Sequence, residues 1–154
     1  MIVFRLTKAK FKNELSGFGS NKYGGRWNSK GIEVIYTSQS RALCLAEIIV
    51  HFDISKVPRE YFLMEIWIPD LSIYHFPQNN LPNGWNSFPY NPMTRKIGNQ
   101  FIQNHEFLVL RLPSSVVLGD FNFLINPYHP DFHKVKIVSN KAFPIDSRLL
   151  FPSR

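Results

Sequence analysis

The chain has 154 residues, a length that suits one folded domain, here predicted to span residues 1–154. Hydrophobic residues make up 44% of it and Phe occurs 14 times, which indicates a packed core and excludes a disordered chain. No apolar run approaches the ~20 residues that cross a bilayer, and the start, MIVFRLTKAKFK, lacks the features of a signal peptide. The single cysteine, Cys44, is expected in the core. These features predict a soluble, cytoplasmic protein.

The net charge of the chain is +7 and its sequence pI is near 9.7, values that raise the question of nucleic-acid binding. Lysines alternate near the start at Lys8, Lys10 and Lys12, but no run of basic residues forms a stripe. A solvated surface, an anionic ligand such as a dinucleotide pyrophosphate, and an acidic protein partner all fit this pattern. A basic module that binds nucleic acid without chemistry stays open as an alternative function.

Taken in order, the chain begins with a predicted strand over residues 1–6, which carries Arg5, and a polar segment over 7–19. A β-branched strand is predicted over 32–38. The later predicted elements are strands over 61–68, 72–76, 107–112, 121–125 and 135–139, a proline-rich loop over 77–92, a helix over 93–104 and a short strand near Leu149. Many strands and few helices predict an α+β fold with a largely antiparallel, strongly twisted sheet.

The stretch from Gly24 to Glu47 organises the rest of the chain. It opens with a double-glycine turn, Gly24-Gly25, whose backbone can adopt positive φ and allow a ligand to approach closely. Arg26 follows at once, and its planar guanidinium with five donors suits a phosphate or a carboxylate. The turn is therefore a candidate anion-binding element.

A helix is predicted from Arg41 to about Phe52, with Ser40 as its N-cap. It is apolar nearly all round, which is typical of a buried helix, and between Ala42 and Phe52 Glu47 is the only residue that must carry charge at neutral pH. A carboxylate in apolar surroundings needs a partner. Two interpretations stay open at this point: a structural ion pair with Arg41 or Arg26, or a catalytic carboxylate.

Several motifs follow one another at fixed spacing. They are Gly24-Gly25-Arg26-Trp27-Asn28, Tyr36 ten residues after Arg26, Glu47 eleven further on, Leu112-Pro113-Ser114, and the run NFLINP from Asn122 to Pro127. In this order they resemble the RES-domain toxins of bacterial RES–Xre type II toxin–antitoxin systems, a family named for an Arg, a Glu and a Ser. The likeness covers essentially the whole chain. It implies an ADP-ribosyltransferase-like fold and an enzyme that consumes NAD, needs no metal and halts growth.

The resemblance also implies the roles of individual residues. Glu47 would stabilise the oxocarbenium-like ribose as the nicotinamide–ribose bond breaks. Arg26 would bind the pyrophosphate, and Tyr36 would offer its ring to the nicotinamide and its phenol to a polar contact. The remaining residues assigned to ligand binding are Ser114, Asn126 and Arg5. An Xre-like antitoxin would cover the site, and nucleic acid would be met only through that antitoxin.

The acceptor stays open among water, inorganic phosphate and a protein side chain, so a protein ADP-ribosyltransferase is an alternative to NAD glycohydrolysis or phosphorolysis. The segment His129-Pro-Asp131-Phe-His133 could present two imidazoles and a carboxylate to a metal, but a capped turn is the favoured interpretation. The glycines over residues 17–25 do not follow G-x-G-x-x-G, which excludes a Rossmann nucleotide site.

Overall fold

A computed structural model describes residues 1–51 and 60–150 of the chain. The strands are β1 (Ile2–Lys8), β2 (Ile35–Ser38), β3 (Tyr61–Trp67), β4 (Ile73–His75), β5 (Val109–Pro113), β6 (Phe121–Ile125) and β7 (Lys136–Phe143). The helices are α1 (Phe18–Tyr23), α2 (Arg41–His51), α3 (Pro92–Asn104) and α4 (Ser147–Leu150), with short 3-10 turns at Ala9–Phe11, Asp70–Ser72, Gln78–Asn80 and Pro130–Lys134.

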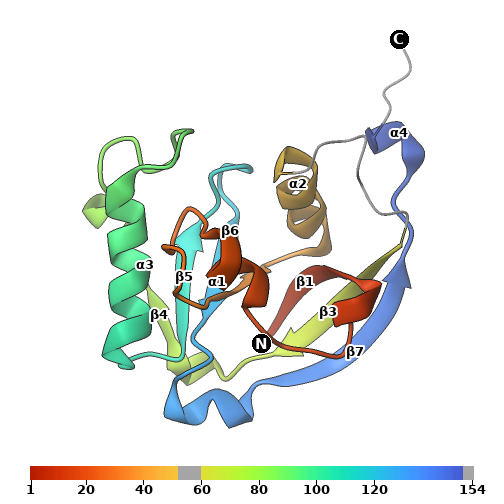
Figure 1. The fold of residues 1–154 in the computed structure, drawn as a ribbon, viewed down its shortest axis with the longest axis horizontal. Helices are drawn as coiled ribbons and strands as arrows, with labels where there is room; N and C mark the ends of the chain where they lie inside the picture. Colours follow the sequence, from red (N-terminus) through yellow and green to blue (C-terminus); the bar gives the residue numbers. More distant parts are fainter. Residues whose placement is uncertain (52–59, 151–154) are drawn as a thin grey trace.

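The described strands form one seven-stranded sheet in the order β4-β5-β6-β2-β1-β3-β7. Every neighbouring pair is antiparallel except β4 and β5, which run parallel. Strands β5 and β6 run in a clearly different direction from β3 and β7, because the sheet is strongly twisted (Figure 1). The predicted α+β class with a largely antiparallel sheet and few helices is confirmed.

The sheet consists of two halves that meet at a narrow seam. β1 pairs with β3 along its whole length, and β2 pairs with β6 at all four of its residues. Between β1 and β2, by contrast, the register holds only one pair, Phe4 opposite Ser38. The two halves therefore separate beyond this pair, and the segments that follow β1 and β2 enclose space between them.

Two buried clusters support the sheet. One cluster joins both halves, since it combines Val3 and Met64 of β1 and β3 with Ile35, Phe123 and Ile125 of β2 and β6. The other lies between α3 and the β5–β6 side of the sheet and includes Trp27 and Ile102. Burial of this apolar surface fixes both halves, and it also anchors the segment around Trp27 that precedes β2.

Three expectations about the chain are wrong or lie outside the described residues. The strand expected near Leu149 is instead the short helix α4, which begins after Asp146, whose carboxylate accepts from the Arg148 backbone N–H at 2.9 Å. Helix α2 is not buried all round: Leu43 and Cys44 are buried, but Val50 is 58% exposed, because one side of the helix packs on the sheet. The expected end of this helix at Phe52 lies outside the described residues.

Candidate functional site

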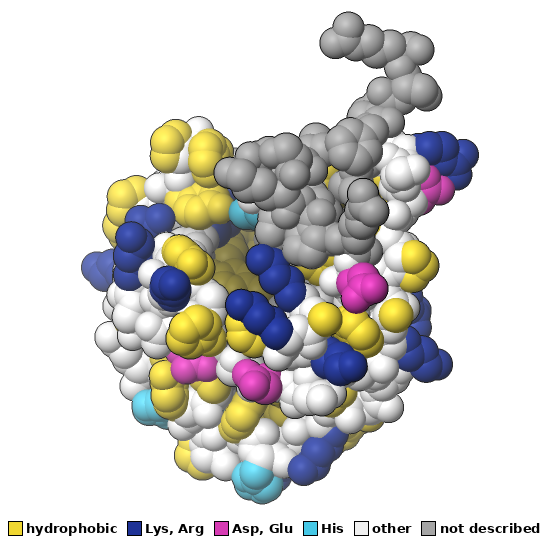
Figure 2. Space-filling model, turned by 45° about the vertical axis from the view of Figure 1, so that its right-hand side comes forward, with side chains coloured by type: hydrophobic (Ala, Val, Ile, Leu, Met, Phe, Trp, Pro, Cys, Tyr) yellow, Lys and Arg dark blue, Asp and Glu magenta, His cyan; other side chains and the backbone are white. Residues whose placement is uncertain are grey.

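A cavity of about 550 Å³ lies beside the seam, between β1, β2 and α2. Four residues predicted to act in the site line it together: Arg5, Arg26, Tyr36 and Glu47. They come from β1, the glycine turn, β2 and α2. On the face shown in Figure 2, a hollow with a hydrophobic wall lies next to Lys and Arg side chains, and the basic side chains are scattered and form no stripe.

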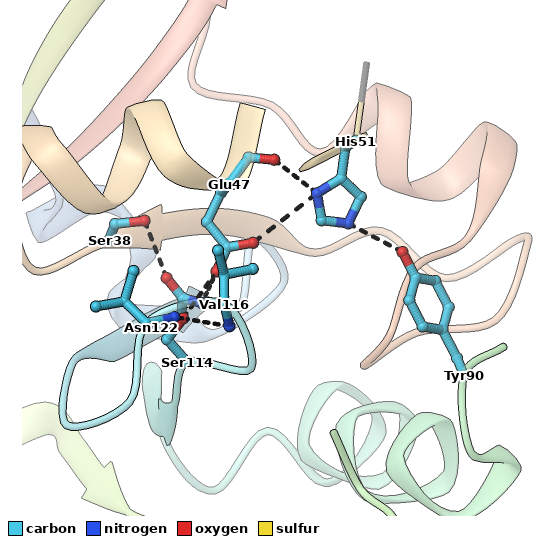
Figure 3. Close-up of polar contacts among 8 residues, drawn as sticks. Ser38, Glu47, His51, Tyr90, Ser114, Val116 and Asn122 are labelled. Atoms are coloured by element: carbon cyan, nitrogen blue, oxygen red, sulfur yellow. Dashed lines mark hydrogen bonds and ion pairs between the residues drawn. The ribbon is translucent and has the colours of Figure 1, made fainter. Parts of the chain in front are cut away.

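The Glu47 carboxylate is held by two polar side chains from the β5–β6 region (Figure 3). Asn122 Nδ2 donates to Glu47 Oε1 at 2.6 Å, and Ser114 Oγ donates to the same oxygen at 3.2 Å. The other oxygen, Oε2, lies 3.9 Å from Nδ1 of His51, one turn further along α2. The Glu47 side chain is 23% exposed, so it is accessible from the cavity.

The structural ion pair considered for Glu47 is not formed. Arg41 pairs with Glu65 of β3, and its guanidinium also lies over the ring of Phe4. Arg26 donates elsewhere, and neither arginine is paired with Glu47 in the described part of the chain. The carboxylate instead accepts hydrogen bonds from the uncharged side chains of Asn122 and Ser114, and it shares the cavity with Arg5 and Arg26 without a direct bond to either.

One nitrogen of the Arg26 guanidinium forms hydrogen bonds with the proline-rich loop. Its Nη1 donates to the backbone carbonyls of Trp85 at 2.7 Å and Ser87 at 2.9 Å. The guanidinium also lies 4.8 Å from the ring centroid of Tyr90, which lines the cavity. Burial lowers the pKa of Arg26, an effect that the neighbouring Tyr90 and Glu47 oppose. Arg26 is thus a half-buried cation that contacts the loop through Nη1, and among the described residues its Nη2 and Nε have no hydrogen-bond partner.

The Tyr36 phenol is bound within the protein. It donates to Asn28 Oδ1 at 2.8 Å and accepts from the Trp27 backbone N–H at 3.1 Å. Burial raises its pKa, so the phenol stays neutral and can donate at physiological pH. The hydroxyl therefore fixes the turn that carries Arg26, and the Tyr36 ring is what remains to face a ligand.

The glycines of the turn have two different functions. Gly24 has φ of 71°, the left-handed region that glycine adopts without strain. At Gly25, a Cβ atom would lie 2.8 Å from the Tyr36 hydroxyl. The close approach expected of this glycine pair is therefore an approach to Tyr36 in the protein itself.

Ser114 and Asn126 do not line the cavity. Ser114 is 1% exposed and sits behind Glu47, where its Oγ also accepts from the backbone N–H groups of Val116 and Val117. Asn126 is fully buried, and its amide donates to the Ile102 carbonyl at 3.0 Å. In this structure Ser114 contacts Glu47 and Asn126 joins β6 to α3, and the ligand contacts expected of these two side chains stay predictions.

Arg5 reaches the cavity from β1, across the seam. Its Nη1 is buried and has no hydrogen-bond partner among the described residues. Burial lowers the pKa of Arg5 to about 10, which leaves the guanidinium charged at neutral pH. A second cation therefore lines the cavity besides Arg26.

No group of His, Cys, Asp and Glu within the described residues could hold a metal ion. In the segment weighed as a metal site, His129 Nδ1 accepts from the Asp131 backbone N–H at 3.0 Å and caps a 3-10 turn. The capped-turn interpretation is confirmed. Among the same described residues, no helix has the length and apolar character to span a bilayer.

Comparison with known protein families gives one match across residues 2–146, to the RES domain. The chain belongs to the RES domain family. The match confirms the resemblance first drawn from the Gly24–Asn28 turn, Tyr36 and Glu47. The RES model stops at residue 146, so an extension of the domain over all 154 residues remains a prediction.

Curated relatives of this RES domain protein are toxins by name. It is 35% identical over 141 residues to a protein of Sphingobium sp. strain YBL2 named Prs ADP-ribosylating toxin, covering 90% of this chain and 88% of that one. It is 34% identical over 152 residues to Toxin Res of Photorhabdus laumondii, covering 97% of both chains.

A solved structure has the same fold. The crystal structure of the M. tuberculosis MbcT–MbcA toxin–antitoxin complex matches with a TM-score of 0.76 over 93% of this chain and 84% of that one, at 19% sequence identity. This likeness confirms that the α+β architecture of the chain is one found in a known toxin–antitoxin complex.

Sequence reasoning missed three side chains of the site, Asn122, His51 and Tyr90. His51 Nδ1 donates to the Glu47 carbonyl at 2.6 Å, because a carbonyl only accepts, and His51 Nε2 lies 3.0 Å from the Tyr90 hydroxyl (Figure 3). Asn122 could have been found from the sequence, because it begins the NFLINP run that indicates the family. The predicted ligand-binding residue of that run is Asn126.

Proposed function

We propose that this RES domain protein is the toxin of a toxin–antitoxin pair and that it depletes NAD by cleaving the nicotinamide–ribose bond. The observation that carries the proposal is the placement of Glu47, Tyr36, Arg26 and Arg5 around one cavity. The cavity volume of about 550 Å³ falls in the range of small-molecule sites. The names of the relatives support the toxin role and the use of an ADP-ribose donor.

The proposed chemistry follows from the charges. When the bond breaks, its electron pair neutralises the nicotinamide ring, and positive charge develops on the ribose. Glu47, which pairs with neither Arg41 nor Arg26 in the described chain, stabilises that charge at short range. Arg26 binds the pyrophosphate through the nitrogens that the loop carbonyls leave free, and Arg5 supplies a second positive charge toward the dinucleotide.

The acceptor of the ADP-ribosyl group is water or inorganic phosphate in the first form of the proposal. A second candidate function is transfer to a protein side chain, because one relative is named an ADP-ribosylating toxin. A cytoplasmic location and an Xre-like antitoxin that covers the cavity complete the proposal. The match to a toxin–antitoxin complex supports the existence of such a partner.

The test is product analysis with purified protein. Incubation with NAD, with and without phosphate, should release nicotinamide together with ADP-ribose or its 1-phosphate. Glu47→Gln keeps the size of the side chain and one acceptor oxygen but removes its charge, and it should lower the rate at least ~100-fold. Near-normal turnover by a folded Glu47→Gln protein would contradict the proposed catalytic role of Glu47.

Three further outcomes separate the alternatives. Radiolabel from NAD that appears on a protein in proportion to the nicotinamide released indicates protein ADP-ribosylation. Salt-dependent binding of RNA or DNA without any turnover of NAD indicates a nucleic-acid module. A purified complex with the neighbouring gene product that cleaves NAD as fast as the free chain contradicts an antitoxin that covers Arg26.

A further inference from the structure

The two oxygens of the Glu47 carboxylate have different surroundings (Figure 3). Oε1 accepts two hydrogen bonds, of which the one from Asn122 is the shorter at 2.6 Å. Oε2 has no hydrogen bond within the described residues and lies 3.9 Å from His51 Nδ1. The carboxylate is thus held through one oxygen, and the other is left for a ligand.

The Asn122 amide is itself fixed in orientation. Ser38 Oγ donates to Asn122 Oδ1 at 2.9 Å. An amide whose oxygen is engaged by a donor on one side presents its NH2 group on the other, and here that group meets Glu47. Ser38 and Asn122 are opposite residues in the β2–β6 register, so the backbone of the sheet sets the distance between them.

Building on the proposed function, we infer that Asn122 is a positioning residue for the catalytic carboxylate and that Ser38 fixes the orientation of the Asn122 amide. The bond to Oε1 prevents rotation of the carboxylate toward His51. Oε2 therefore faces the ribose in the direction in which positive charge develops. This preorganisation acts in the transition state, whereas binding of the pyrophosphate rests on Arg26.

This role predicts a specific kinetic pattern. Loss of the Asn122 amide should lower kcat about 10- to 100-fold, the effect of one hydrogen bond to a charged group, with KM for NAD changed less than about twofold. Ser38→Ala should lower kcat less, about 3- to 10-fold, because the amide remains but is free to rotate. A merely structural role would lower the unfolding temperature without separating kcat from KM.

The experiment compares Asn122→Ala and Ser38→Ala with a matched control, Asn140→Ala. Asn140 is also a half-buried Asn on a strand of this sheet, and its Nδ2 bonds to the Lys12 carbonyl and to Asn13 Oδ1, away from Glu47. Its substitution should leave kcat and KM unchanged. Crystal structures of the parent protein and of Asn122→Ala provide a readout besides activity, since the Glu47 carboxylate should be rotated in the variant.

Two results overturn the inference: an unchanged kcat in a folded Asn122→Ala protein, or an unmoved Glu47 carboxylate in its crystal structure. Failure of the proposed function looks different, because the parent protein itself would then release no nicotinamide. In that case the position of the Glu47 carboxylate in the variant crystal structure alone decides whether Asn122 positions it.

Discussion

Tyr36 and Asn28 share a hydrogen bond of 2.8 Å that fastens β2 to the turn carrying Arg26. Asn28 is fully buried, and its Nδ2 donates in turn to the carbonyls of Ser20 at 2.8 Å and Ile32 at 2.7 Å. One asparagine thus joins α1, the turn and the start of β2. The position of Arg26 depends on the hydrogen bonds of Tyr36 and Asn28, because they hold the turn on which Arg26 lies.

Tyr36→Phe should destabilise the protein and weaken NAD binding. The change leaves the buried Asn28 Oδ1 without a donor, which costs about 1–3 kcal/mol. Because the turn then loosens around Arg26, KM for NAD should rise more than kcat falls. Urea titration and steady-state kinetics measure the two effects. Parent-like stability and KM together would show that the phenol is dispensable and that only the ring acts.

Arg26→Lys should weaken NAD binding, and Arg26→Ala should weaken it further. A lysine keeps the positive charge but cannot hold the Trp85 and Ser87 carbonyls and a phosphate at once with a planar fork. Isothermal titration calorimetry with a slowly cleaved NAD analogue measures the affinity. Arg148→Lys, at an arginine that pairs with Asp146 near the C-terminal end, is the control and should bind like the parent. Equal affinities for all three variants would make Arg26 a structural residue.

Gly98→Ala should destabilise the fold by about 1–3 kcal/mol. Gly98 lies in α3 against the segment before β2, and a Cβ atom there would stand 1.7 Å from the Trp27 carbonyl oxygen. The helix must shift away from Trp27, next to Arg26, to admit the methyl group. Gly19→Ala in α1 is the matched change, since nothing lies within 4 Å of its Cβ position, and it should not destabilise. Denaturant unfolding of both variants makes the comparison.

The Cys44 thiol should resist modification in the folded protein. Burial raises its pKa from 9.0 to about 11, and the side chain is 5% exposed. A disulfide reagent at pH 8 should therefore react only after guanidinium is added. Because the folded pKa is raised, the contribution of the thiol to stability is complete below pH 9.0 and is lost as pH rises toward 11. Between pH 9.0 and 11 the free energy of unfolding of the parent protein should thus fall more than that of Cys44→Ala. Equal losses would contradict a raised pKa of the Cys44 thiol.

Local sequence patterns predicted two of the regular elements almost to the residue. The predicted strand 121–125 coincides with β6, and the predicted helix 93–104 differs from α3 by its first residue. β2 begins at Ile35, later than predicted, because the Val34 N–H donates to Ser20 Oγ in α1 and not to a neighbouring strand. That competition is a tertiary contact, and no local pattern reveals it.

Part of the candidate site was also predictable, but from a family resemblance and not from local sequence patterns. Arg26, Tyr36 and Glu47 were identified through a family resemblance, whereas a ligand-binding Asn and a buried structural Asn look alike in one sequence. Asn126 was chosen over Asn122 on that basis, and only the fold shows which amide reaches Glu47. The contact between His51 and Tyr90 joins residues 39 positions apart, so it too depends on tertiary structure.

The narrow seam between β1 and β2 has a consequence for the order in which the protein is made. β2 meets β1 only at the Phe4–Ser38 pair, and its full-length neighbour is β6, which lies late in the chain. During synthesis, β2 and α2 leave the ribosome long before Asn122 exists to hold Glu47. A growing chain therefore carries Arg26, Tyr36 and Glu47 without an assembled cavity. The chemistry proposed for it can start only after β6 has been synthesised and its Asn122 has reached Glu47.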